Sequence, residues 1–199
     1  MSDQILWFAS RGSGIVSLLL STAVVCLGFL IVIRWSRPSW PRFLTAEFHR
    51  RLALLSIVFV GLHIATAILD PFTSLGLAAA IVPFASSYRP LAVALGVISV
   101  DLVLAVIVTS LLRERLGHRL WRAVHWLAYA AWPMAVLHSL TAGSDAFAPW
   151  MLAITGLCVV AVAGSLAWRT AVGGELRSSL PTVVATPSRL PGIARRRSG

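Results

Sequence analysis

The chain contains five long apolar stretches that carry almost no charged residues. They cover residues 15–33, 52–69, 91–112, 123–140 and 146–168. A helix needs roughly 20 apolar residues to cross the hydrocarbon core of a bilayer, at about 1.5 Å per residue. Only 12% of the 199 residues are charged, whereas a soluble domain has about 25%. The pattern excludes an ordinary soluble domain and predicts an all-α, integral membrane helical bundle of five spans.

The first apolar stretch differs from the core of a signal peptide. It is too long for such a core, and arginines rather than small residues follow it, at Arg34, Arg37 and Arg42. We therefore expect this segment to remain in the mature chain as an anchor.

The arginines fix the expected orientation. All seventeen basic residues are arginines, and fifteen of them lie in residues 34–51, 113–122 and 169–199, whereas the alternate connections hold two. Cytoplasmic loops of membrane proteins carry an excess of Lys and Arg. The pattern predicts a multi-pass protein of the cell membrane with its N-terminus outside and its C-terminus in the cytoplasm. The net charge of +10 is then a topology signal, and nucleic acid is not an expected partner.

Three further segments complete the expected organisation. Residues 71–88 also lack charged residues, but Pro71 and Pro83 leave only 75–82 strongly apolar, which is too short to span. We expect a re-entrant or interfacial loop there, after a helix that ends at Asp70 and Pro71. Residues 1–14 form an outer N-terminal segment, residues 15–168 the transmembrane domain, and residues 169–199 a disordered basic cytoplasmic tail.

Four of the five histidines form two pairs on the second and fourth predicted spans, which run parallel. His49 and His63 are 14 residues apart, and His125 and His138 are 13 apart. At about 1.5 Å per residue these separations correspond to roughly 21 and 20 Å along a helix. His49 and His125 should therefore share an inner level, and His63 and His138 an outer level.

Such facing imidazoles are typical of haem ligation. Two neutral histidines can bind a haem iron from both sides and leave no open position, which suits electron transfer. We therefore expect two b-type haems with His49 and His125, and His63 and His138, as axial ligands. Thirteen residues leave an ideal helix about 140° from its starting face. We expect Pro133, which interrupts the helix, to bring His138 toward the haem side.

Other side chains are candidates for supporting roles. Arg50 and Arg122 near the inner haem, and Arg89 or Arg11 near the outer one, could contact the anionic propionates; the inner arginines could equally serve topology alone. Trp132 lies between the two levels and is either an inter-haem relay or a packing residue.

A non-redox function is the alternative from another class. A transporter or an assembly partner could use the intramembrane histidines together with Asp101, the only carboxylate deep in a span. A colourless purified protein would favour this alternative.

At these residues the chain resembles the ferric reductase-like transmembrane domain family, which includes the membrane core of NADPH oxidases, ferric reductases and the haem-bearing membrane subunit of bacterial methionine sulfoxide reductase systems. The resemblance rests on FHRRLALLSIVFVGLH, which starts at Phe48, and on HRLWRAVHWLAYAAWPMAVLH, which starts at His118. It implies electron transfer from the cytoplasmic side through an inner and an outer haem to an external acceptor.

The donor and acceptor are left open by the resemblance. The chain has no GxGxxG motif after a strand, so we expect the electron-transfer subunit of an oxidoreductase without its own flavin and nicotinamide domain. The donor is then a cytoplasmic reductase or a membrane quinol, with a quinone near Arg50, Arg119 and Arg122 or a flavin on a partner protein. The acceptor could be ferric iron, oxygen or a separate redox protein.

Overall fold

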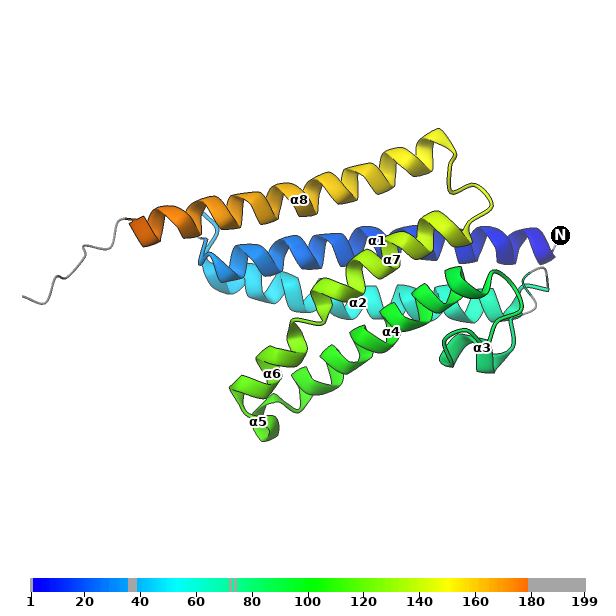
Figure 1. Ribbon diagram of the computed structural model, residues 1–199, viewed down its shortest axis with the longest axis horizontal. Helices are drawn as coiled ribbons and strands as arrows, with labels where there is room; N and C mark the ends of the chain where they lie inside the picture. The colour runs from blue at the N-terminus through cyan, green and yellow to red at the C-terminus, as the bar shows by residue number, and fades with distance from the viewer. Residues whose placement is uncertain (1, 36–38, 72, 74, 179–199) are drawn as a thin grey trace, which may run out of the picture.

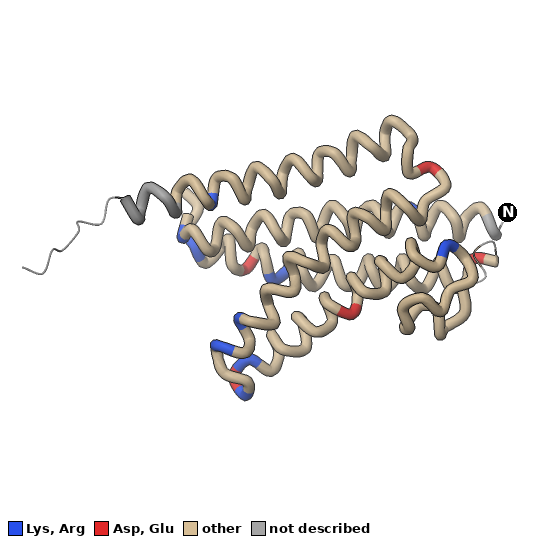
Figure 2. The backbone as a smooth tube through the Cα atoms, viewed as in Figure 1, with Lys and Arg blue, Asp and Glu red and all other residues tan. Residues whose placement is uncertain are grey.

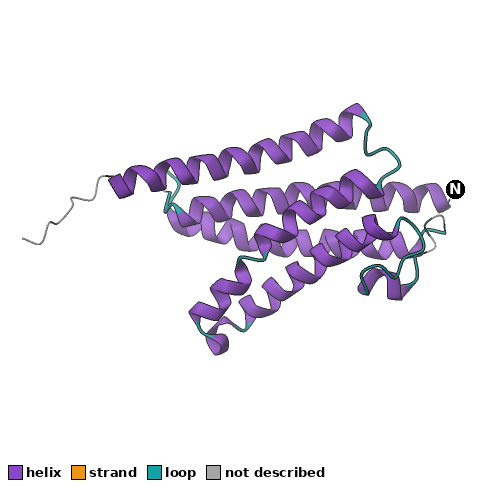
Figure 3. Ribbon diagram, in the orientation of Figure 1, coloured by secondary structure: helices purple, strands orange, loops and turns teal. Residues whose placement is uncertain are grey.

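The computed structural model describes residues 2–35, 39–71, 73 and 75–178, and its regular elements in these ranges are all helices (Figure 3). The elements are α1 (Ser2–Val32), α2 (Arg42–Leu69), α3 (Leu77–Ile81), α4 (Pro90–Leu111), α5 (Arg113–Leu116), α6 (His118–His125), α7 (Ala128–Ala142) and α8 (Pro149–Ser178). The predicted all-α class agrees with this part of the chain.

In the part of the chain that the structure describes, four helices are long and apolar enough to cross a membrane: α1, α2, α4 and α8. The fourth predicted span, residues 123–140, is divided between α6 and the 15-residue α7. In the described part of residues 71–88 the chain forms the five-residue α3, which is too short to span a membrane, and folds back beside the start of α4 (Figure 1). As the sequence suggests, α2 ends at the Asp70 cap.

The helices form two antiparallel pairs, α1 with α2 and α4 with α7. Helix α8 packs along α1. Figure 1 places the α1–α2 connection, α5, α6 and the end of α8 at one end of the bundle, and the N-terminus, α3 and the α7–α8 connection at the other. Most of the described arginines gather at the first of these ends (Figure 2). This distribution is the one expected of a membrane protein with a basic cytoplasmic face.

The small core lies where α1, α7 and α8 meet. Leu18, Val136 and Cys158 are buried there, and Trp132 packs against them. Many large apolar side chains elsewhere on the spans are exposed, which is expected where lipid rather than water is the solvent. Buried hydroxyls within α1 donate hydrogen bonds to carbonyls one turn earlier, as Ser17 does to Ser13. These groups therefore need no water.

Both ends of the helical bundle extend past the predicted spans. Helix α1 begins at Ser2, so the predicted outer segment continues the first span as a helix. Helix α8 reaches Ser178, ten residues beyond the predicted end of the fifth span. The remainder of the predicted disordered tail, residues 179–199, lies outside the described residues.

Candidate functional site

The inner histidines lie opposite each other across the bundle. His49 is near the start of α2, and His125 is the last residue of α6. Their ring centroids are 6.3 Å apart, and the ring planes are inclined by 53°. The ring of Trp121 lies 5.1 Å from that of His125. Two imidazoles from separate helices thus face a common space at the basic end of the bundle.

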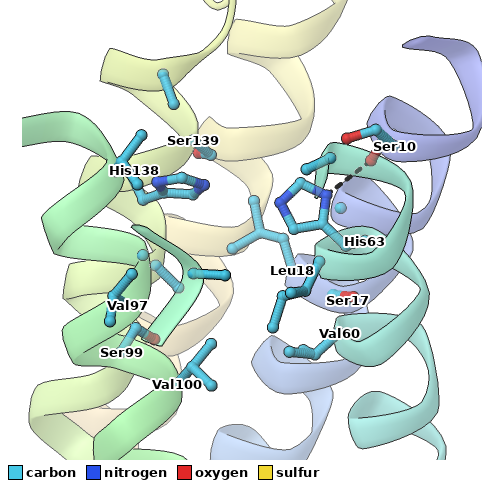
Figure 4. Close-up of a pocket in the computed structure, with 18 of the residues that line it drawn as sticks. Ser10, Ser17, Leu18, Val60, His63, Val97, Ser99, Val100, His138 and Ser139 are labelled. Carbon is cyan, nitrogen blue, oxygen red and sulfur yellow. Dashed lines mark hydrogen bonds between the residues drawn. The ribbon is translucent and has the colours of Figure 1, made fainter. Parts of the chain in front are cut away.

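The outer histidines repeat this arrangement at the opposite end. His63 on α2 and His138 on α7 have ring centroids 6.0 Å apart, with planes inclined by 78°. Figure 4 shows the two rings pointing toward each other across a pocket, with Leu18 of α1 below them. The structure therefore places opposite each other the histidines that the sequence assigns to each level.

Both distances fit a haem between the rings. A nitrogen ligand lies about 2 Å from a transition metal and an imidazole centroid about 1 Å behind its nitrogen, so two rings on opposite sides of one iron have centroids about 6 Å apart. Haem iron accepts such imidazole nitrogens as axial ligands. The spacing of the two pairs therefore suits a bis-histidine haem at each level.

Hydrogen bonds select the nitrogen that each histidine can offer. The Nδ1 atom of His49 lies 2.9 Å from the carbonyl oxygen of Val24, and that of His63 lies 2.8 Å from the carbonyl of Ser10. Since a carbonyl only accepts, Nδ1 carries the proton and donates it. The lone pair then belongs to Nε2, which is the usual arrangement of a histidine ligand.

His138 follows the same rule, whereas His125 differs. The His138 Nδ1 atom lies 2.7 Å from the carbonyl oxygen of Ala92 on α4. The His125 Nδ1 atom is buried and has no hydrogen-bond partner within the part of the chain that the structure describes. Three of the four imidazoles are therefore oriented by the backbone of a neighbouring helix.

A cleft of about 360 Å³ extends from the outer pair between the two helix pairs. Val60 and Ile64 of α2 and Val97 and Val100 of α4 contribute to its apolar walls, and α1 contributes its floor. Ser10 and Ser139 lie toward its outer end (Figure 4), and Arg11, which follows Ser10 on α1, also lines the cleft. An apolar cleft with a polar rim suits a flat, hydrophobic group that carries anionic substituents.

The predicted propionate contacts are not all near the cleft. Arg89 lies outside its lining and donates hydrogen bonds to the carbonyls of Thr141 and Gly143. Arg11 does line the cleft and forms an ion pair with Asp145. At the outer level the structure therefore favours Arg11 over Arg89 as the cation closest to the histidines.

The inner arginines are exposed. The Arg50 side chain is 73% exposed and lies 3.5 Å from Glu47 in an ion pair. Arg122 is exposed beside His118, with which it shares a hydrogen bond. These positions are compatible with a propionate contact and with a role in topology alone.

Trp132 and Asp101 are the two remaining residues that the sequence analysis singled out. The Trp132 indole donates a hydrogen bond to the Thr22 hydroxyl, 3.0 Å away, and packs against the core. Asp101 is exposed on α4 and is absent from the lining of the cleft. Of these two residues, Trp132 is the one that lies in the bundle interior.

The structure adds features that the sequence did not single out. The carbonyls that accept from the histidines, and the glycines Gly14, Gly28 and Gly96 against which the rings pack, belong to α1 and α4. The sequence does hold an indication of these contacts. Gly14 and Gly28 are 14 residues apart, which is also the separation of His49 and His63. Within the described residues, no group of three or more His, Cys, Asp or Glu side chains is suited to hold a metal ion.

Comparison with known proteins adds one match. The model of the ferric reductase like transmembrane component family matches residues 13–136, more than half of the chain, including His49, His63 and His125. No curated protein and no solved structure matches the chain. His138 lies two residues beyond the matched range, so its assignment rests on its position opposite His63. The length of the match, together with the paired histidines in a bundle of membrane-spanning helices, shows that the chain belongs to the ferric reductase like transmembrane component family.

Proposed function

We propose that the protein is a membrane cytochrome b that transfers single electrons across the cell membrane, with two bis-histidine haems. The observation that carries this proposal is the pair of facing imidazoles at each level, with ring centroids 6.3 and 6.0 Å apart. Each b-type haem, when bound, supplies a one-electron redox couple. Family membership supports a role in membrane electron transfer.

The proposed ligand set leaves no open axial position on either haem iron. His49 and His125 would fill both axial positions at the inner level, and His63 and His138 would do so at the outer level. A closed ligand set favours electron transfer over binding of oxygen at the metal. The acceptor is therefore expected to meet the outer edge of the site rather than the iron.

The arrangement also suits transfer over the thickness of a membrane. The sequence separation of 14 between His49 and His63 places the two levels about 21 Å apart along α2. Trp132 lies in the interior between these levels, beside Thr22 of α1. We propose it as an aromatic relay between the two sites, in addition to its packing role.

The topology proposed for this function has five crossings. Helices α6 and α7 together connect the basic end of the bundle with the opposite end, beside α4 (Figure 1). With the basic end in the cytoplasm, the N-terminus lies outside and the end of α8 inside. Electrons would enter at His49 and His125 from a cytoplasmic reductase or membrane quinol and leave from the outer level to an external acceptor.

The non-redox alternative gains no support from the structure. A transporter would use the histidines together with Asp101, but Asp101 is exposed on α4 and does not line the cleft that contains His63 and His138. Asp101 is thus not placed to act together with the outer histidine pair.

The test is the haem content of the purified protein. Protein from haem-sufficient cells should be red, with two haems per chain and a low-spin spectrum that changes on reduction with dithionite. His63→Ala and His138→Ala should each lose one haem, whereas His118→Ala, in an exposed residue outside both pairs, should keep both. Colourless wild-type protein would refute the proposal.

The donor can be tested with the same preparation. Reduction by a quinol and reduction by a soluble flavin reductase with its nicotinamide are measured separately by the change in the haem spectrum. Whichever donor reduces the wild-type protein rapidly identifies the partner class. If neither reduces it while dithionite does, both proposed donors are wrong.

A further inference from the structure

The three histidines that donate to a carbonyl share one local arrangement. In each case the carbonyl belongs to residue i of a neighbouring helix, and residue i+4 of that helix is glycine. We call this unit a seat. The three seats are Ser10 and Gly14 for His63, Val24 and Gly28 for His49, and Ala92 and Gly96 for His138.

The seats differ in how closely the ring approaches the glycine. A Cβ atom added at Gly96 would lie 2.7 Å from the Nδ1 atom of His138, and one at Gly14 would lie 3.0 Å from that of His63. At Gly28 the nearest atom, Cε1 of His49, would be 3.7 Å away, which is ordinary van der Waals contact. The outer histidines are thus seated tightly, and His49 loosely.

The seats repeat along the helices. Fourteen residues bring an ideal helix back to within about 40° of the same face. The two seats on α1, at 10/14 and 24/28, are separated by this interval. The same interval from the seat on α4 leads from Ala92 and Gly96 to Val106 and Ser110.

This fourth position is filled in a different way. The Ser110 hydroxyl donates to the carbonyl of Val106, 2.6 Å away, and the Trp121 indole donates to Ser110 Oγ, 3.2 Å away. His125, which is 13 rather than 14 residues from His138, has no hydrogen-bond partner for Nδ1 among the described residues. Its ring lies against that of Trp121 instead.

We propose that Gly14 and Gly96 position the outer pair of histidines, and that at the fourth position the Ser110 hydroxyl and the Trp121 indole bonded to it take the place of a seat and thereby position His125. This inference rests on the proposed function, since positioning matters for a ligand. It makes the outer pair the rigid one and the inner pair the adjustable one. Each of the four proposed residues, the two glycines together with Ser110 and Trp121, is a positioning residue that acts through a histidine.

The first test substitutes the glycines. In Gly96→Ala and Gly14→Ala the added methyl group must displace the imidazole, because the helix backbone cannot retreat easily. Substitution of a ligand's supporting groups typically weakens metal binding about 10- to 100-fold. We expect the outer haem to transfer to excess apomyoglobin about 10- to 100-fold faster than in wild type. In Gly28→Ala the inner haem, which His49 would bind, should transfer at the wild-type rate.

Matched controls separate positioning from folding. Gly12→Ala on α1 and Gly156→Ala on α8 add a methyl group where nothing lies within 4 Å. Alanine is a better helix former than glycine, so none of the variants weakens its own helix. If Gly96→Ala and Gly14→Ala lose haem no faster than these controls, the seats do not position the ligands.

The second test addresses Trp121 by electron paramagnetic resonance, which reports the orientation of the axial imidazoles. Trp121→Phe and Ser110→Ala should both shift the largest g value of the inner haem and leave that of the outer haem unchanged. His63→Ala and His49→Ala provide reference spectra for each haem alone. Trp168→Phe, at a half-exposed tryptophan of α8, is the control. An inner signal that matches this control would refute the role of Trp121.

These outcomes are distinct from failure of the proposed function. A wild-type protein without haem would overturn the function itself. A wild-type protein with two haems whose signals and transfer rates are insensitive to all four substitutions would overturn only the positioning proposal.

Discussion

The ion pair between Arg11 and Asp145 should stabilise the outer end of the bundle. Arg11 belongs to α1, and Asp145 belongs to the connection between α7 and α8. A side chain at Gly143 would meet the Arg11 guanidinium directly, so the glycine leaves room for the pair. Asp145→Asn keeps the shape of the side chain and removes its charge, which leaves the arginine without its anionic partner.

The magnitude follows from the exposure of the two side chains. Arg11 and Asp145 are 19% and 23% exposed, which is intermediate between a surface pair and a buried one. Exposed pairs contribute about 0–1 kcal/mol, whereas removal of one partner of a buried pair costs about 3–5 kcal/mol. We expect a loss of about 2 kcal/mol, which corresponds to about 4–8 °C in melting temperature for a chain of this size.

Thermal unfolding of the detergent-solubilised protein measures this loss. The control is Glu47→Gln, which breaks the ion pairs with Arg50 and Arg51, whose side chains are 73% and 74% exposed. Such a surface change should lower the melting temperature by no more than about 4 °C. Addition of Arg11→Gln to Asp145→Asn should recover part of the loss, because no lone charge remains. If the melting temperature of Asp145→Asn equals that of Glu47→Gln, the ion pair between Arg11 and Asp145 does not stabilise the fold.

Three further predictions concern the interior of the bundle. Trp132→Phe removes the hydrogen bond to Thr22, which contributes about 0.6 kcal/mol, and also loses packing in the core; thermal unfolding should therefore show a loss of at least about 0.6 kcal/mol, with haem content unchanged. Pro133→Ala should favour a straighter helix and reduce the haem content to about one per chain through loss of the inner site at His125, as a haem assay would show. Asp101→Asn should leave the haem content unchanged in the same assay, because this side chain lies outside the lining of the cleft; a loss of haem would contradict that assignment.

The sequence predicts the helical class and the levels of the histidines because both follow from regular repeats. Apolar length predicts the four long helices α1, α2, α4 and α8, and axial rise alone gives His49 and His125 one level and His63 and His138 the other. Side-chain direction is harder to predict. Arg89 has the correct level for an outer propionate, but it binds carbonyls at the end of α7, whereas Arg11 on α1 lines the cleft. This difference depends on tertiary packing, which no periodicity encodes.

The supporting groups of the histidines are hidden from the sequence for a different reason. The hydrogen-bond acceptors are backbone carbonyls, which every residue has, so Val24 and Ala92 carry no chemical signal. Glycine in a membrane helix is common and has many uses. Only the coincidence of two 14-residue spacings, one between Gly14 and Gly28 and one between His49 and His63, relates the two helices in advance.

The 13-residue spacing of His125 and His138 accounts for the break between α6 and α7. On a straight helix these residues would point about 140° apart, so both cannot face α2. The helix is tightened directly after His125. There the amides of Leu127, Tyr129 and Ala130 donate to carbonyls three residues earlier instead of four. Pro133, which cannot donate to the carbonyl of Tyr129, lies just past this tightened segment. The distortion therefore reorients His125 rather than His138. This distortion lies at the end of α6, the helix in which Trp121, and not a histidine, contacts the fourth position of the repeat at Ser110.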